Sequence, residues 1–143
     1  MNLRLLANRA HAWLLVTARG KLGARVGGRP VLVLETHGRR SDRQRRTPVQ
    51  YLRHGVELLI VASNAGHREP AAWSLNLQRQ PACRALVDGH WLDVHARFAK
   101  DEEHDRLWTL LAKGNPWLGK AAARAGHELA VIALAPSRDH PPS

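Results

Sequence analysis

The feature that most restricts the fold of this chain is a series of short β-rich runs, each closed by residues that favour turns. The runs cover 31–34, 47–52, 58–62, 83–87, 91–98 and 129–134. Each has the length of a strand, and His54-Gly55 and Asp88-Gly89 are turn signals between neighbouring runs. The spacing therefore predicts about six antiparallel strands. The first two would pair across a long polar connection over 36–46.

Three further segments show helical patterns. A helix is predicted over 71–80, where Pro81 would end it. A second begins at Asp101, which can cap it, and ends before Gly114. A third, weaker pattern covers 117–125. Strands in sequence with helices added late predict a mainly β, α+β fold built on a small antiparallel barrel, and not a βαβ sheet.

The 143 residues are enough for one domain with its own core. We divide the chain into a barrel domain over 28–135, a preceding segment over 1–27 and a tail over 136–143. Apolar residues recur within 2–17 at helical spacing, and a glycine-rich connector follows over 19–29. The helix over 2–17 would pack on the domain or, alternatively, rest on a membrane surface.

No apolar run is long enough to cross a bilayer, and no signal peptide with a cleavage site is evident. The chain has one cysteine, which excludes an internal disulfide and favours a reducing compartment. We therefore expect a cytoplasmic protein. It could touch the inner face of the membrane through 2–17.

Positive charge is concentrated in the first third of the chain. The whole sequence carries 22 Lys and Arg against 12 Asp and Glu, but residues 1–54 hold only Glu35 and Asp42 as acids. Five arginines fall within the eight residues 39–46, between two predicted strands. Guanidinium groups gathered on a rigid turn can hold phosphate or clustered carboxylates. The alternatives are a solvated hairpin tip and a nucleic-acid patch, although Tyr51 is the only aromatic residue nearby for base stacking.

The sequence contains no recognisable catalytic motif. There is no Gly-x-Gly-x-x-Gly after a strand, no phosphate-binding P-loop, and no nucleophile elbow. His90 and His95 are five residues apart on a predicted strand, so they would point to opposite faces, and we expect no metal site. Cys83 lies within an apolar strand with Arg84 as its only basic neighbour. Redox chemistry, if present, must come from a bound cofactor.

Four blocks, in order, carry a resemblance to a known family. They are Gly28 to Thr36, the Gly-Arg-Arg-Ser loop with Arg45 and Thr47-Pro48, the segment Val61 to Gly66, and Trp73-x-x-Asn76-Leu77 with Pro81. Together they resemble the deazaflavin-dependent nitroreductase family, and the resemblance continues to Ala135. It implies a split β-barrel like that of FMN-binding proteins. It also implies that the protein uses reduced coenzyme F-420 to pass hydride to a quinone, a nitro compound or a similar acceptor.

The resemblance also implies where the coenzyme would bind, since this cofactor ends in a phosphate and an oligoglutamate tail. Phosphate and tail would lie at Arg39, Arg40, Ser41 and Arg45, with Arg46 added on charge alone and Thr47 and Pro48 as the neighbouring wall. The ring would lie near Val61, Ala62, Ser63 and Asn64, closed by Trp73 and Asn76. The substrate pocket would be formed by Gln50, Asn115, Leu118 and Ala121. FMN is a less favoured cofactor, and no catalytic side chain and no metal are expected.

Two departures from the family pattern bear on these expectations. Asp42 and Gln44 stand where family members commonly have Gly and Pro, which would lower the affinity for the coenzyme. The pocket residues supply no aromatic cage, which makes nitro reduction a less favoured activity. Two other functions remain open from the residues alone. One is a carrier that binds the deazaflavin or a flavin without turnover, and the other is a nucleic-acid-binding barrel.

Overall fold

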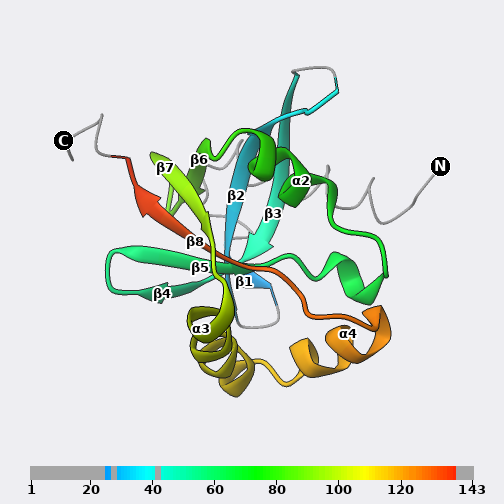
Figure 1. The fold of residues 1–143 in the computed structure, drawn as a ribbon. Coiled ribbons are helices and arrows are strands. Elements are labelled where there is room, and N and C mark those ends of the chain that lie inside the picture. Colours follow the sequence, from blue (N-terminus) through cyan, green and yellow to red (C-terminus); the bar gives the residue numbers. More distant parts are fainter. Residues whose placement is uncertain (1–24, 27–28, 41–42, 138–143) are drawn as a thin grey trace.

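A computed structural model describes residues 25–26, 29–40 and 43–137 of the chain. In this part the strands form one antiparallel sheet in the order β1-β2-β6-β7-β8-β5-β4, and β3 pairs with β2 (Figure 1). The strands are β1 (Arg25–Val26), β2 (Arg29–His37), β3 (Gln44–Gln50), β4 (Leu52–His54), β5 (Glu57–Val61), β6 (Ala82–Val87), β7 (His90–Phe98) and β8 (Val131–Pro136). The helices are the 3-10 turn η1 (Asn64–Gly66), α2 (Ala72–Arg79), α3 (Asp101–Gly114) and α4 (Trp117–Ala125).

The core fills both faces of the curled sheet. Within the curl, Leu32 and Leu34 of β2 pack with Ile60 of β5 and with Ile132 and Leu134 of β8. Period-two alternation sends the intervening residues of the same strands to the other face. On β5 and β8 those residues pack beneath α3 and α4, and on β2 they pack with β6. Burial on both faces explains why 31–34 reads as a continuous apolar run.

The helices take different places around the sheet. Helix α2 lies beside the end of the long β2–β3 ribbon, whereas α3 and α4 lie at the opposite end of the molecule (Figure 1). This separation puts the arginine-rich turn next to α2 and away from the two later helices.

The expected mainly β, α+β architecture is confirmed, and the differences concern strand ends. The predicted strand 47–52 is divided at Tyr51 into β3 and β4, and β3 begins at Gln44, inside the predicted loop. The early start follows from pairing with β2, whose last three residues continue the ladder to His37↔Gln44. The short strand β1 lies within the predicted connector. Together β1 and β4 raise the six expected strands to eight in the described residues.

The predicted helices α2, α3 and α4 are present, but Asp101 does not cap α3. Lys100 occupies the N-cap position without a side-chain bond, and Asp101 is the first helical residue. Asp101, Glu102 and Glu103 still place negative charge at the positive end of the helix dipole. The predicted helix 2–17 lies outside the described residues. Within those residues, no helix is both long and apolar enough to span a bilayer.

Candidate functional site

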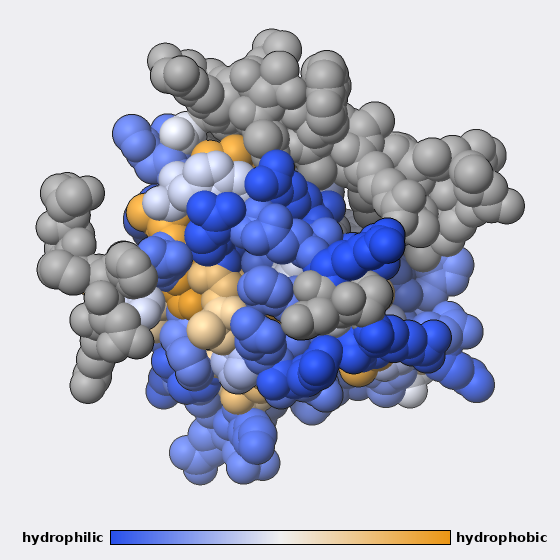
Figure 2. Space-filling view, turned by 90° about the horizontal axis from the view of Figure 1, so that it is seen from above, coloured by the Kyte–Doolittle hydropathy of each residue, from blue (hydrophilic) through white to orange (hydrophobic). Residues whose placement is uncertain are grey.

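The arginine-rich turn is a tight connection at the end of a long two-stranded ribbon. Strands β2 and β3 stay paired up to His37 and Gln44, and the Gly38 N–H donates to the Arg43 carbonyl at 2.7 Å. The turn therefore spans only 38–43. Seen from above, this end of the molecule is mostly hydrophilic (Figure 2). The ribbon carries its basic side chains to the rim of the sheet, where an anionic group can reach them.

Helix α2 holds the first half of this turn. Asn76, which is 4% exposed, accepts hydrogen bonds from the Arg39 backbone N–H at 3.1 Å and from Arg39 Nη1 at 3.3 Å. Its amide nitrogen donates to Thr36 Oγ1 at 3.2 Å. One helical turn later, Arg79 Nη1 donates to the Arg39 carbonyl at 2.7 Å. Because a buried amide and a guanidinium both bind its backbone, the conformation of the turn is set by α2.

Strand alternation divides the arginines of β3 between two faces of the ribbon. Arg46 lies opposite Glu35 in the ladder, and its Nε donates to Glu35 Oε2 at 2.9 Å. Arg84 of β6 binds the other oxygen of the same carboxylate, with Nη2 at 2.8 Å from Oε1. Both guanidiniums also lie over the Trp91 ring, at 5.1 Å and 4.5 Å from its centroid. These four side chains form one closed group, here named the Glu35 cluster.

The Glu35 cluster pairs one carboxylate with two guanidinium groups, so it keeps a net charge of +1. Burial opposes ionisation of Glu35, but the hydrogen bonds and charges of Arg46 and Arg84 prevail and hold the pKa of its carboxyl below the ordinary value. Burial, with the nearby Glu35 charge, raises the pKa of Cys83 to about 12, so this thiol is not a nucleophile at neutral pH. Arg46, which the sequence placed at the phosphate on charge alone, thus already has an acidic partner.

Arg45 is directed to the other face. It lies opposite Thr36, and directly opposed residues on antiparallel strands share a face, so Arg45 is on the side of Thr36, Asn76 and α2. Arg40 and Arg45 are exposed, and neither forms an ion pair within the described part of the chain. Ser41 lies outside the described residues. The structure therefore gathers Arg39, Arg40 and Arg45 at one end of the ribbon and separates Arg46 from them.

The predicted ring segment runs from the end of β5 into η1. The Ala62 N–H donates to the Ala130 carbonyl at 3.0 Å, and Asn64 donates through its side chain to the Glu69 carbonyl at 2.8 Å. Gly66 has φ +81°, and a Cβ there would lie 3.3 Å from Arg124 and 3.5 Å from Ala121. Val61 and Ser63 are half-buried. The close approach at Gly66 brings this segment against α4.

The residues predicted for the substrate pocket lie on β3, on α4 and between α3 and α4. Leu118 and Ala121 of α4 are buried in the core at 6% and 0% exposure, and both belong to clusters against which Val61 packs. Asn115 is half-buried, and its side-chain oxygen has no hydrogen-bond partner among the described residues. Gln50 lies on β3 opposite Val31, at the far end of the strand from Arg45.

Other predicted residues lie at the edge of the core. Trp73 of α2 is half-buried and packs against the main core cluster, as its helical spacing with Leu77 suggests. Thr47 and Pro48 are half-buried on β3, opposite Leu34 and Val33. Trp73 and Thr47 are on the side of the main core cluster, whereas Pro48 shares the face of Val33 and Arg46.

Sequence reasoning missed several residues that position the site. Thr36 and Arg79 hold Asn76 and the turn, while Glu35 and Trp91 hold Arg46 and also bind Arg84. The spacing of Asn76 and Arg79, one helical turn apart, was a usable signal for Arg79. The Glu35 cluster had no such signal, because it depends on the register between β2, β3 and β6.

The curled antiparallel sheet carries exposed arginines at one ribbon end, which are suited to an anionic group. The sequence model of the family described as F420H(2)-dependent quinone reductase matches residues 7–136. The chain belongs to this family. It is therefore an oxidoreductase, and its cofactor is coenzyme F-420.

Individual relatives agree with this assignment. The F420H(2)-dependent quinone reductase Rv1261c of Mycobacterium tuberculosis is 31% identical over 110 residues, which is 75% of this chain and 74% of that protein. A solved F420-H2 dependent reductase, FDR-A, has a TM-score of 0.67 at 22% identity, covering 74% of this chain and 94% of its own. A FAD-binding protein from Mesorhizobium loti has a TM-score of 0.51 at 15% identity, covering 76% and 79%. The two solved structures support the fold.

Proposed function

We propose that this protein reduces a quinone with hydride from reduced coenzyme F-420 and that the α2-side arginines hold the acidic end of the coenzyme. The observation that carries the binding site is the division of the arginines. Arg40 and Arg45 are exposed without an acidic partner among the described residues, beside a turn whose backbone α2 holds. Exposed guanidiniums on a fixed backbone are suited to phosphate and carboxylate groups.

The chain fits the coenzyme through donors and apolar walls. The phosphate and the glutamate tail would meet Arg39, Arg40, Ser41 and Arg45, and Thr47 would form the wall next to them. Pro48 lies on the other face of β3, with Arg46, so we remove it from this wall. The ring would lie along Val61, Ala62, Ser63 and Asn64, with Trp73 nearby. Asn76 acts through Arg39, since its amide is already used to hold the turn. We remove Arg46 from the binding set because its guanidinium is already held by Glu35 and the Trp91 ring.

The chemical contribution of the protein is positioning. When bound, the reduced coenzyme supplies the hydride, so the chain needs to orient two reactants and exclude water between them. No described side chain is arranged as a nucleophile, and the one cysteine is buried with a raised pKa. A quinone is the favoured acceptor because the family description and the Mycobacterium tuberculosis relative both name it.

Fluorescence titration tests the binding site. The full chain should quench or shift the emission of coenzyme F-420, while FMN and single-stranded DNA should compete poorly. Arg53→Ala is a matched control for Arg45→Ala, because Arg53 is an exposed arginine on β4, outside the proposed site. Equal weakening by the two variants would refute the assignment of Arg45.

Turnover tests the acceptor. Oxidation of the reduced coenzyme is followed in the presence of menaquinone analogues and, separately, of nitroaromatics. We expect acceleration by the quinones above the rate with nitroaromatics. Tight coenzyme binding with no acceleration by any acceptor would favour a carrier. DNA binding with a steep salt dependence and no response to the coenzyme would favour the nucleic-acid alternative.

A further inference from the structure

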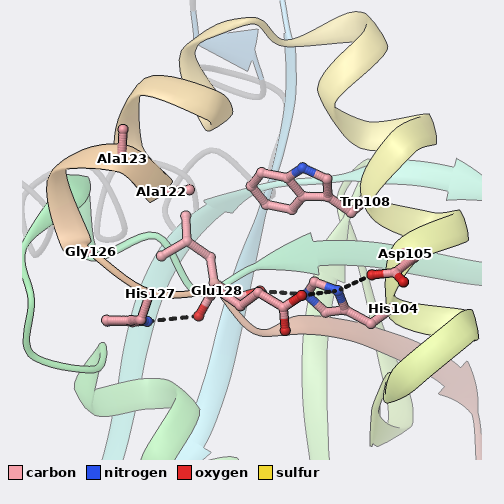
Figure 3. A pocket seen from close by; sticks show the side chains of 9 residues that line it. His104, Asp105, Trp108, Ala122, Ala123, Gly126, His127 and Glu128 are labelled. Atoms are coloured by element: carbon pink, nitrogen blue, oxygen red, sulfur yellow. Dashed lines mark hydrogen bonds and ion pairs between the residues drawn. The ribbon is translucent and has the colours of Figure 1, made fainter.

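A second group of polar side chains lies in a cavity of about 430 Å³ between α3, α4 and the segment that precedes β8. It is at the end of the molecule opposite the arginine-rich turn (Figure 1). Figure 3 shows that His104 and Asp105 of α3 and Glu128 of the loop point toward one another. The proposed coenzyme site uses none of these residues.

His104 has one ring nitrogen satisfied and one buried without a hydrogen-bond partner. The residue is 7% exposed, and its Nε2 lies 2.8 Å from the Leu129 carbonyl. A carbonyl can only accept, so Nε2 carries the proton and donates it. In the neutral ring Nδ1 then presents a lone pair, and this atom is buried with no hydrogen-bond partner. A buried unpartnered ring nitrogen calls for a ligand or an ion.

Two carboxylates face that lone pair. Asp105 Oδ1 lies 3.5 Å and Glu128 Oε1 3.6 Å from His104 Nδ1, distances too long for good hydrogen bonds. All three ligand atoms lie within 4.8 Å of one another. Three electron-rich atoms gathered without a donor repel one another unless a cation lies among them.

Two of the three ligand spacings, those from His104 Nδ1, match the edge of a coordination tetrahedron, and the third is within 4.8 Å. Zinc binds imidazole nitrogen and carboxylate oxygen at about 2.0–2.2 Å, so two ligand atoms of a tetrahedral site are separated by about 3.3–3.6 Å. The two distances from His104 Nδ1 are at the upper end of that interval. Both carboxylates are mostly exposed, so they can adjust to an ion. The Nε2 bond to the Leu129 carbonyl is the outer contact that orients metal-binding histidines.

We propose that His104 Nδ1, Asp105 and Glu128 bind a divalent transition-metal ion of the zinc type, with a fourth position open to water from the cavity. His127 lines the same cavity but is not a ligand, because its two ring nitrogens bind the Glu128 and Arg68 carbonyls at 2.7 Å and 3.0 Å. The ion would tie the first turns of α3 to the segment entering β8. Its role would be structural, since none of its three ligands is a residue of the proposed coenzyme site and the arginine-rich turn lies at the opposite end of the molecule.

This proposal departs from the expectation drawn from the sequence. His90 and His95 were weighed there, and no metal was expected. His104 and Asp105 are adjacent on α3, but Glu128 is more than twenty residues away, across α4. A single histidine beside an acid is common on any helix. Only the packing of α3 against the loop before β8 shows that the third ligand reaches the same point.

Calorimetric titration of the tag-free full chain with zinc chloride, after removal of metal by a chelator, tests the proposal. We expect one equivalent bound and a higher melting temperature with zinc, since an ion that binds only the folded state stabilises it. Asp105→Asn and Glu128→Gln should each weaken binding about tenfold or more. Cobalt should give the visible spectrum of a tetrahedral site in the unaltered protein and lose it in the double variant.

Glu102→Gln is the matched control, because Glu102 is an exposed acid of the same helix outside the cluster. It should bind zinc as the unaltered protein does. The proposal is overturned if the protein binds no zinc, or if the double variant, shown folded by circular dichroism, keeps the same affinity. The Asp105→Asn and Glu128→Gln variants and their double variant all keep His104, so the test does not depend on replacing a buried side chain.

Discussion

Two neighbouring arginines of the β2–β3 ribbon lie on opposite faces, and only one of them has an ion-pair partner among the described residues. Arg46 lies beside Glu35, Arg84 and Trp91, and its guanidinium is paired with the Glu35 carboxylate that Arg84 also binds. Arg45, one residue earlier, shares the α2 side with Thr36 and has no ion-pair partner in the part of the chain that the structure describes. One face uses cations to stabilise the fold, and the other leaves cations available to an anionic ligand. Charge density in a sequence therefore does not by itself identify a binding residue.

The largest expected effect comes from removing the carboxylate of the Glu35 cluster. Glu35→Gln removes the shared negative charge from between two guanidiniums and should lower the free energy of unfolding by about 2–3 kcal/mol. The value is below that of a fully buried pair because the side chains of both arginines are 40% exposed. Chemical denaturation measures it.

Glu57→Gln provides the comparison, because Glu57 pairs with the more exposed Arg97. Its cost should stay below about 1 kcal/mol. Equal costs for the two variants would mean that burial of Glu35 adds nothing.

The next effect concerns the open face. Arg45→Ala should weaken coenzyme F-420 binding by about 2 kcal/mol, the value of one charge-assisted contact, and leave the melting temperature nearly unchanged. Arg46→Ala should do the reverse and lower stability with little loss of binding. Fluorescence titration and thermal unfolding of both variants separate these results. A larger binding loss for Arg46→Ala would place the coenzyme on the opposite face.

A smaller effect tests the support that α2 gives to the turn. Asn76→Ala removes the acceptor of the Arg39 N–H and the donor to Thr36, and it should cost about 1–2 kcal/mol of stability. Coenzyme affinity should fall as well, although Asn76 does not touch the ligand in our proposal. Amide hydrogen exchange at 38–40 should become faster in the variant. Unchanged exchange there would show that Asn76 does not hold the turn.

The smallest expected effect is a pH dependence. The pKa of Glu35 is lowered from its ordinary value of 4.5 in the folded state, so its stabilisation is present above about pH 4.5 and is lost as pH falls through the folded pKa. The stability difference between the unaltered protein and Glu35→Gln should therefore shrink below that pH. Denaturation at a series of pH values measures it, and a difference that stays constant to pH 2 would contradict the ion-pair origin.

Much of the fold could be read from the chain because its signals are local. The run 58–62, the Asp88-Gly89 turn and the helix ending near Gly114 each depend on neighbouring residues, and each is found close to its expected place. Strand order could not be read in the same way. β8, the last strand, is inserted between β7 and β5, and this pairing depends on the whole curled sheet.

The sequence predicted which segments form the candidate site, but not the directions of their side chains. The arginine-rich turn and α2 were both identified, and they do meet through Arg39 and Asn76. The direction of each arginine was not predicted, because 36–46 was interpreted as one loop, in which side chains have no defined face. Once Gln44, Arg45 and Arg46 pair with β2, alternate side chains must point to opposite sides.

The sequence alone determined that this chain forms a small mainly β domain with a dense basic turn, since apolar periodicity and turn residues act over a few positions. It also carried enough of the family's blocks to indicate the cofactor. Only the tertiary structure decided which arginine pairs with Glu35 and which stays available to a ligand. It also decided which acids gather around His104. Those outcomes depend on contacts between residues far apart in the chain, and such contacts form only after the strands are in register and the helices are packed.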